Sequence, residues 1–346
     1  LPIYNDIASY KMSNPLNHSL LRTFSKTPYL PNIRTDLNAY LDNLFELQAA
    51  SLANRMKNIG CSRLVIGVSG GLDSTLALLV CVKAVKMLYI HTQNITAVTM
   101  KGLGTSTKTY DNSIELMKKL NVNLKDIPIE KSVLQHFSDI THSKDTYDTT
   151  YENAQARERT QILFSLANMD NALVVGTGDL SEASLGFCTF GGDHLASFNV
   201  NICINKTTIR SLINRLSETE FIKIAKTLKD ILDTPISPEL LPTDENGQIA
   251  QKTEDILGEY ILHDFFLYYL VKYNFSVEKI LTYAVATFKE KFDKEYISQK
   301  LDLFISKLIT SQFKRSCSVD SANITEINLK NFAIPSDLSD DIAKYL

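Results

Sequence analysis

The stretch LVIGVSGGLDS, residues 64–74, combines residue types that can bind a polyphosphate. It predicts a buried strand, a Ser-Gly-Gly turn, and a helix whose first turn carries Asp73 and Ser74. Such a turn brings backbone N–H groups and one carboxylate to a single point, which suits a metal-chelated polyphosphate. A Walker-type loop would have a Lys directly after its glycines, and this chain has Leu72, Asp73 and Ser74 there. The loop therefore has an Asp that can hold Mg²⁺ and lacks such a Lys. This combination favours adenylation, in which pyrophosphate leaves, over kinase chemistry. A plain strand-turn-helix junction would leave the two serines and the Asp unexplained.

A second acidic segment, GTGDLSE at 176–182, follows another predicted strand. Asp179 and Glu182 stand three positions apart, and this spacing has two interpretations. They could form a capping box that only satisfies free N–H groups at a helix start. Alternatively, Glu182 could lie beside Asp73 at the carboxyl ends of neighbouring strands and share a Mg²⁺ that bridges ATP phosphates.

The elements that must position these residues alternate between strand and helix. Apolar periodicity predicts strands at 64–68, 95–100, 124–127 and 172–175, and helices at 36–58, 74–89, 108–120, 130–138 and 150–169. This alternation predicts an α/β fold, a doubly wound parallel sheet that binds ligands beyond the carboxyl ends of its strands. We expect an ordered loop at 183–205, helices at 206–216 and 220–232, an irregular segment at 233–259, and helices from there to about residue 313.

Composition excludes several classes of protein. The chain has 346 residues and a formal net charge of -3, which argues against a broad nucleic-acid surface. Its five cysteines are scattered without a C-x-x-C pair, so we expect reduced thiols in a cytoplasmic protein. No window approaches the roughly 20 apolar residues that cross a bilayer. Residues 1–35 are Pro-containing and aperiodic, which predicts a linker or N-terminal extension, and Leu1 suggests a fragment of a longer polypeptide.

The segment SGGLDS resembles the PP-loop of the N-type ATP pyrophosphatases. Four further segments together resemble the synthetase domain of glutamine-dependent NAD synthetases, across about residues 20–340: TYENAQAR (150–157), GTGDLSE (176–182), TPISPELLP (234–242) and SQFKRS (311–316). The resemblance assigns residues 36–346 to this domain. It implies a Rossmann-like, adenine nucleotide alpha hydrolase-like fold with additional C-terminal helices, and a homodimer or larger homo-oligomer. It also implies ATP-dependent amidation of deamido-NAD to NAD through an acyl-adenylate, with Mg²⁺ and ammonia.

The resemblance also implies the site residues. The ATP-binding residues would be Gly67, Ser69, Gly70, Gly71, Asp73, Ser74, Met100 and Thr177. The substrate-binding residues would be Asn153, Arg157, Glu182, Phe187, Cys188, Thr189, Phe190 and Lys314. The metal ligands would be Asp73, Glu182 and Asp193, and the catalytic residues Asp73, Asp193 and Lys206. Asp193 could hold or deprotonate ammonium, and Lys206 could contact the ATP phosphates.

Several of these residues also have ordinary structural interpretations. Asn153 and Arg157 could belong to a solvated helix face, Asp193 to a turn, and Lys314 to a helix end. Phe187 and Phe190 replace a Trp and a Tyr common in relatives, and could simply pack a loop. Lys101 and Lys108 stand where relatives often have Pro and Arg, so an Arg contact there would lose its bidentate fork. The aromatic stripe at 263–269 is best explained as core or as a subunit interface.

Members of this family carry a nitrilase-like glutaminase domain before the synthetase domain. These residues do not include one, so we expect the chain to use free ammonium, with glutamine served by a separate or removed domain. The segments at 186–193 and 233–259 are candidate lids. Two other functions stay open: a PP-loop tRNA-modifying enzyme, disfavoured by the net charge and the lack of paired cysteines, and a non-catalytic nucleotide-binding module, disfavoured because Asp73 and Glu182 are both present.

Overall fold

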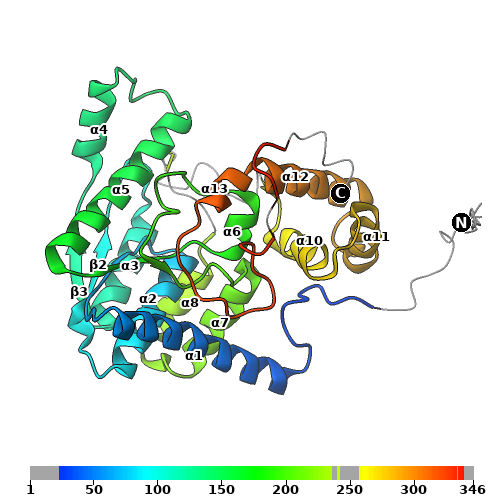
Figure 1. The fold of residues 1–346 in the computed structure, drawn as a ribbon, viewed down its shortest axis with the longest axis horizontal. Coiled ribbons are helices and arrows are strands. Elements are labelled where there is room, and N and C mark those ends of the chain that lie inside the picture. The colour runs from blue at the N-terminus through cyan, green and yellow to red at the C-terminus, as the bar shows by residue number, and fades with distance from the viewer. Residues whose placement is uncertain (1–22, 236–239, 242–256, 333, 339–346) are drawn as a thin grey trace, which may run out of the picture.

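The computed structural model describes residues 23–235, 240–241, 257–332 and 334–338, and contains a parallel five-stranded sheet, which lies in the left part of Figure 1. The strands are β1 (Leu64–Gly67), β2 (Ile95–Thr99), β3 (Asn123–Asp126), β4 (Leu173–Gly176) and β5 (Phe198–Asn199). Their order is β3-β2-β1-β4-β5, and every neighbouring pair is parallel. The carboxyl ends of all five strands therefore meet at one edge of the sheet.

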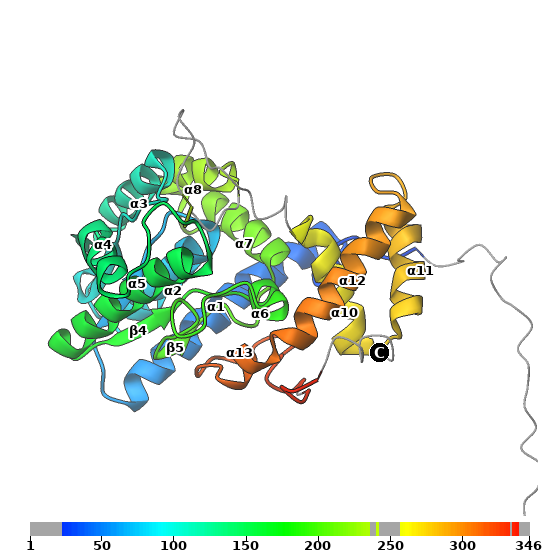
Figure 2. The same ribbon diagram turned by 90° about the horizontal axis from the view of Figure 1, so that it is seen from above.

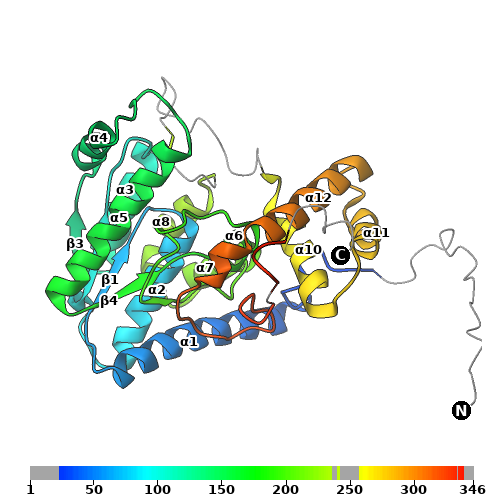
Figure 3. The ribbon, with the colours of Figure 1, turned by 45° about the horizontal axis from the view of Figure 1, so that its top comes forward.

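Helices cover both faces of this sheet because successive strand residues point to opposite sides. Leu64 and Ile66 of β1 pack into a core with α1 (Arg34–Asn58), α2 (Leu72–Met87), α3 (Thr107–Lys119), α7 (Lys206–Glu218) and α8 (Ala225–Leu232). Val65 of the same strand packs on the other face, with α4 (Glu130–Asp139) and α5 (Thr149–Asp170). Figure 3 shows β1 and β4 between α5 and α2. The expectation of a doubly wound α/β sheet is confirmed.

A second hydrophobic core lies outside the sheet layers. It is built from α10 (Tyr260–Tyr273), α11 (Val277–Phe288) and α12 (Lys294–Thr310), together with Leu180 and Leu185 of the short α6 (Leu180–Leu185). Figure 2 shows these three helices grouped beside the α/β part, with α6 and α13 (Gln312–Ser316) toward the sheet. These are the additional C-terminal helices that were expected. Because α6 belongs to this core and follows β4, it joins the helical part to the edge where the strands end.

The strand order fixes where a ligand can bind. The chain moves from β1 outward to β2 and β3, and then returns to the other side of β1 for β4 and β5. A crevice opens at such a reversal, beyond the carboxyl ends of the two strands that flank it. Here these strands are β1 and β4, and the loops that follow them carry the Ser-Gly-Gly turn and the GTGDLSE segment.

Two sequence expectations need correction. The segment 183–205 is not a continuous loop, because α6 extends into it and Phe198–Asn199 pairs with β4 as β5. A two-residue strand is too short to produce a periodic pattern. The single helix expected at 220–232 is a 3-10 turn (Ile222–Ile224) followed by α8. Most of the irregular segment expected at 233–259 lies outside the described residues. Within the described residues, no helix combines the length and the apolar character needed to span a membrane.

Candidate functional site

The turn after β1 is shaped by hydrogen bonds within the turn itself. The backbone N–H of Ser69 donates to Ser74 Oγ over 3.3 Å, and the N–H of Gly71 donates to Ser69 Oγ over 3.2 Å. Gly70 has a φ of +88°, and a Cβ on it would lie 2.1 Å from the Thr109 carbonyl oxygen of α3, so no larger residue fits without displacement. The two serines and Gly70 are thus explained by the shape of the loop. The Asp73 carboxylate takes no part in the hydrogen bonds that shape the turn.

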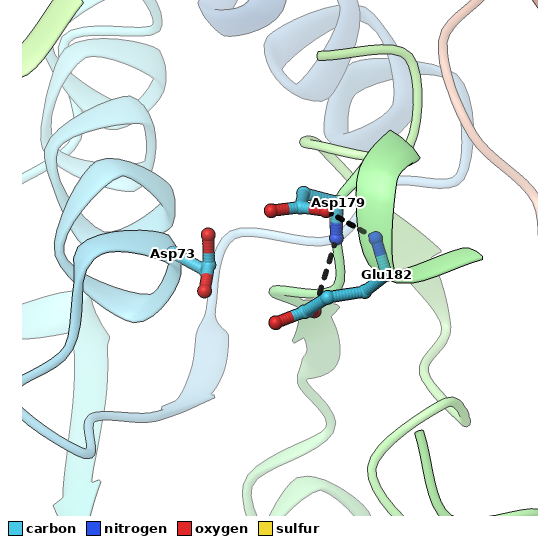
Figure 4. Close-up of side chains that lie close together, drawn as sticks. All are labelled: Asp73, Asp179 and Glu182. Carbon is cyan, nitrogen blue, oxygen red and sulfur yellow. Dashed lines mark hydrogen bonds between the residues drawn. The ribbon is translucent and has the colours of Figure 1, made fainter. Parts of the chain in front are cut away.

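The Asp73 carboxylate meets two acidic side chains that follow β4. One carboxylate oxygen each from Asp73, Asp179 and Glu182 lies within 4.8 Å of the others, and we call these three residues the carboxylate cluster. Figure 4 shows the three side chains reaching toward a common space, Asp73 from α2 and the other two from the start of α6. The cluster therefore bridges the two strand ends that flank the crevice.

The capping box and the cluster coexist because they use different oxygens. Asp179 Oδ1 accepts a hydrogen bond of 2.7 Å from the Glu182 N–H, and Glu182 Oε2 accepts one of 3.5 Å from the Asp179 N–H. The other oxygens, Asp179 Oδ2 and Glu182 Oε1, face Lys206. Both sequence interpretations of this pair are therefore compatible with its geometry.

Lys206, the first residue of α7, places its ammonium among all three carboxylates. Its Nζ lies 2.7 Å from Asp73 Oδ2, 2.7 Å from Asp179 Oδ2 and 2.9 Å from Glu182 Oε1, and its side chain is 1% exposed. Burial alone would lower the pKa of Lys206, but the carboxylates of Asp179, Asp73 and Glu182 raise it well above its ordinary value. The lysine is therefore charged, and it is held as the internal counter-ion of the cluster.

One ammonium does not balance three carboxylates, of which Asp179 is fully buried and Asp73 and Glu182 are partly exposed. Burial raises the pKa of Asp179 well above its ordinary value and that of Glu182 to about 7, and in both cases the neighbouring carboxylates add to the effect while Lys206 opposes it. In addition, Asp73 Oδ1 is buried and makes no hydrogen bond with any described residue. Carboxylate oxygens are the ligands that Mg²⁺ prefers, so this donor set fits a divalent cation.

Two cavities meet beside the cluster. The larger, about 280 Å³, lies between the turn after β1, the end of β2 and α5. Among the predicted site residues, its lining includes Gly67, Ser69, Gly71, Asp73, Ser74, Met100, Thr177, Glu182, Phe187 and Asp193. The smaller, about 70 Å³, is lined by Cys188 and Lys314 among others. Thr177, Glu182 and Asp193 line both, so they form the boundary between the two spaces.

The predicted substrate residues on α5 and in the loop 186–194 mostly bind one another. Thr189 donates from Oγ1 to Asn153 Oδ1 over 2.9 Å and from its N–H to Asp193 Oδ1 over 2.6 Å. Arg157 donates to the Phe190 carbonyl oxygen over 3.1 Å, and Lys314 Nζ donates to the carbonyl oxygens of Gly186 and Cys188. These contacts fold the loop against α5 and α13.

Not every predicted residue faces the cavities. Six of them line neither one: Gly70, Asn153, Arg157, Thr189, Phe190 and Lys206. Phe190 is 42% exposed and stacks on His194, with ring centroids 5.2 Å apart. Asp193 lines both cavities and burial raises its pKa, yet the third carboxylate of the cluster is Asp179. The structure thus gathers a set of carboxylates that differs by one residue from the predicted metal ligands.

Two residues of the site gave no functional signal in the sequence. Asn201 Nδ2 donates to the carbonyl oxygens of Asp73 over 2.9 Å and Thr177 over 3.1 Å, and so joins the two loops of the crevice. Asp264, inside the aromatic stripe 263–269, is buried and accepts hydrogen bonds from Ser181, Asn205 and Thr207. Nothing in the pattern marks Asn201, whereas Asp264 could have been noticed as one acid in an otherwise apolar and aromatic run.

Comparison with known proteins shows to which family the chain belongs. A model of the family NAD synthase matches residues 44–316. The chain belongs to the NAD synthase family. It is 32% identical over 359 residues to the glutamine-dependent NAD(+) synthetase of Mycobacterium leprae, covering 95% of this chain and 53% of that protein. It is also 32% identical to the enzyme of the same name from Mycobacterium tuberculosis, covering 92% of this chain and 51% of that protein. The chain thus spans about half the length of these relatives.

Solved structures share the fold. A glutamine-dependent NAD(+) synthetase from Cytophaga hutchinsonii matches with a TM-score of 0.69 at 18% identity, over 88% of this chain and 55% of that one. An NMN synthetase from Francisella tularensis matches with a TM-score of 0.56 at 24% identity, over 73% of this chain and 95% of that one. The family resemblance read from the sequence motifs, and the Rossmann-like fold that it implied, are confirmed.

Proposed function

We propose that this chain catalyses ATP-dependent amidation of deamido-NAD to NAD, with residues 36–346 as the synthetase domain and 1–35 as an extension. The observation that carries the proposal is the carboxylate cluster beside the larger cavity, at the point where the sheet reverses its strand order. In a chain of the NAD synthase family, these groups in that place support the proposal that a carboxylate is adenylated. The proposed substrates are ATP, deamido-NAD and ammonia.

The proposed reaction has two steps. In the first, a nicotinate carboxylate oxygen attacks the α-phosphorus of ATP, and the bond to the β-phosphate breaks with release of pyrophosphate. In the second, ammonia attacks the acyl carbon of the adenylate, and AMP leaves with the former carboxylate oxygen. Asp73 and Glu182, with Asp193 as a further candidate, would hold Mg²⁺, which when bound would neutralise phosphate oxygens as pyrophosphate departs.

The chain's own groups have separate proposed tasks in these steps. The backbone N–H groups of the turn at 69–71 would bind the polyphosphate. Asp193, at the boundary of the two cavities, would accept a proton as ammonium becomes the attacking ammonia. Lys314 holds the loop 186–194 by two backbone carbonyls and would place its residues beside the dinucleotide.

The test is turnover with defined acceptors. The chain is given ATP, Mg²⁺ and ammonium with deamido-NAD, with the corresponding deamido-mononucleotide, or with unrelated carboxylic acids, and AMP, pyrophosphate and amide product are measured. We expect the dinucleotide to support the largest kcat/KM. A preference for the mononucleotide would revise the substrate, and the absence of AMP with every acceptor would refute adenylation.

The ammonia source and the assembly are tested separately. We propose that this chain uses free ammonium and not glutamine, and that it forms a homodimer or larger homo-oligomer. NAD formation from glutamine by this chain alone would refute the first statement, and a monomer in light scattering at assay concentration would refute the second. Limited proteolysis with and without ATP and deamido-NAD tests the loop at 186–193 as a lid, because equal cleavage in both conditions would exclude closure; most of the other predicted lid, 233–259, lies outside the described residues.

A further inference from the structure

Lys206 lies where a cation bound by the carboxylate cluster would lie. Its ammonium is within 2.9 Å of an oxygen from each of Asp73, Asp179 and Glu182, and the side chain is 1% exposed. An ammonium is a compact cation that carries three donors and no acceptor. It therefore satisfies three carboxylates in much the same way that a small metal ion would. A free divalent cation reaching these oxygens must compete with a charge that is already there.

Displacing this ammonium is unfavourable unless it gains a new anion. The contacts of Lys206 Nζ within the described chain are the three carboxylates and, at 5.3 Å, the ring of Tyr260. Because the Lys206 side chain is 1% exposed, an ammonium that lost its carboxylates would be an unpaired charge shielded from water, which is strongly disfavoured. A polyphosphate in the adjoining cavity would supply anionic oxygens to receive the ammonium, and at the same moment the metal would supply the charge that the carboxylates lose.

We propose that, because of Lys206, the carboxylate cluster binds a metal ion together with a polyphosphate in preference to a free metal ion. This inference rests on the proposed use of ATP and Mg²⁺ by the site. The lysine acts as an internal competitor, so metal and nucleotide bind with positive coupling. Because coupling between two ligands is reciprocal, each raises the affinity of the other by the same factor. Without the ammonium, the cluster should bind a free cation directly and most of the coupling should vanish.

The structure offers a matched control elsewhere. Lys83 on α2 also stands between two carboxylates, with its Nζ 2.6 Å from Glu46 and 2.9 Å from Glu220, and its side chain is 19% exposed. It does not line either described cavity. Removal of Lys83 therefore frees an acidic pair without opening the proposed metal position. A Lys83→Met variant shows whether loss of any paired lysine is enough to create a cation site.

The experiment measures binding of Mn²⁺ by electron paramagnetic resonance, which reads free Mn²⁺ directly and needs no turnover. The intact chain, Lys206→Met and Lys83→Met are each titrated with Mn²⁺ alone and with Mn²⁺ plus the α,β-methylene analogue of ATP, whose α–β bridge cannot be cleaved. For the unmodified chain we expect the analogue to tighten Mn²⁺ binding about 10- to 100-fold, a usual range for coupled sites. For Lys206→Met we expect Mn²⁺ alone to bind at least about tenfold more tightly than it does to the unmodified chain, with a correspondingly smaller effect of the analogue.

Lys83→Met should behave as the unmodified chain. If Lys206→Met binds Mn²⁺ alone no more tightly than the unmodified chain, the inference is wrong. Lys206→Gln serves as a second variant if the methionine variant does not fold, since its amide can still donate to the carboxylates. Thermal unfolding adds an independent readout, because Mn²⁺ should raise the Tm of either Lys206 variant more than it raises that of the unmodified chain.

Failure of the proposed function gives a different result. If the chain produces no AMP with any acceptor, and Lys206→Met still gains affinity for Mn²⁺, the lysine is a competitor in a site with another reaction. If the chain makes NAD and Lys206→Met gains no affinity, the proposed function stands and Lys206 has no such role.

Discussion

The two sides of the crevice are held in place in opposite ways. On the β1 side, the hydrogen bonds that shape the turn join residues no more than five positions apart. On the β4 side, Lys206 reaches Glu182 from 24 positions away and Asp179 from 27, and Asp264 reaches Ser181 from 83. The first side is built by local sequence and the second by tertiary structure. This difference predicts which substitutions lower the rate of the reaction, which destabilise the site, and which only strain the turn.

The largest expected effect is that of Asp73→Asn, because Asp73 carries the contribution of the β1 side to the cluster. Loss of its charge removes a proposed metal ligand, so we expect kcat for AMP formation to fall on the order of 10²- to 10³-fold, as when a transition-state charge loses its stabilising partner. Asp111→Asn on α3 is the control, since Asp111 is exposed and lines neither described cavity. Retention of more than a tenth of the activity by a folded Asp73→Asn would contradict the metal role.

The next effect concerns the β4 side, through Asp264 on α10. Its carboxylate accepts hydrogen bonds from Ser181 Oγ on α6 and from Asn205 Nδ2, Thr207 N–H and Thr207 Oγ1 at the start of α7. Ser181 Oγ in turn accepts the Lys206 N–H over 2.9 Å. This one buried acid therefore ties the helix that carries Asp179 and Glu182 to the helix that carries Lys206.

We expect Asp264→Ala to lower the free energy of unfolding by on the order of 4 kcal/mol, because buried donors lose a charged acceptor. Urea unfolding measures the loss, and hydrogen exchange at the Lys206 amide shows whether the start of α7 loosens. Asp42→Ala is the comparison, since Asp42 binds Arg215 on the same α7 but is 46% exposed, so its loss should be at most about 1 kcal/mol. Equal losses from the two variants would mean that Asp264 has no special position.

This contrast also explains what the sequence could and could not predict. The turn at 69–74 and the strand-helix alternation could be predicted from the sequence, because the residues that indicate each element lie within a few positions of one another. Asp179 was recognised only as half of a capping box, since its second partner, Lys206, is 27 residues away in sequence. Asn201 carried no pattern, because an Asn that bonds two backbone carbonyls depends on where the fold brings them. Asp264 was not recognised from the sequence, because the aromatic stripe that contains it, residues 263–269, was interpreted as core or as a subunit interface.

A third prediction concerns the titration of His263 on α10. Burial lowers the pKa of His263 to about 4, and its Nε2 donates to the Leu257 carbonyl oxygen over 2.8 Å, which partly opposes that shift. In the unfolded chain the pKa of a His is about 6.5. Between these values His263 binds more protons in the unfolded chain, so the contribution of His263 to stability falls as pH drops from about 6.5 toward 4, by at most about 3 kcal/mol. The raised pKa values of Asp179, Glu182 and Asp264 act in the opposite direction.

Unfolding in urea across this pH range measures the loss. His263→Gln, which can still donate to Leu257 but does not titrate, should remove that part of the pH dependence. Since His263 adjoins Asp264, the protection of the Lys206 amide against hydrogen exchange, measured relative to its intrinsic rate at each pH, should fall at low pH before that of the Ser69 amide. Simultaneous loosening of both amides would show that the two sides of the crevice do not respond separately.

The smallest expected effect concerns the turn after β1. There, replacing a glycine has two separate energetic costs, backbone strain and a steric clash. Gly60 and Gly70 both have positive φ, at +66° and +88°, but a Cβ on Gly60 has no atom within 4 Å, whereas one on Gly70 would lie 2.1 Å from the Thr109 carbonyl oxygen. Gly60→Ala should therefore cost only the strain of the left-handed conformation, about 1 kcal/mol. Gly70→Ala adds displacement of the turn from α3, so we expect about 2 kcal/mol in urea unfolding. The extra loss should come with weaker binding of the ATP analogue, because the displaced N–H groups are those proposed to bind phosphate. Equal losses, with unchanged nucleotide affinity, would mean that the turn can shift without consequence and that its local hydrogen bonds do not set its position.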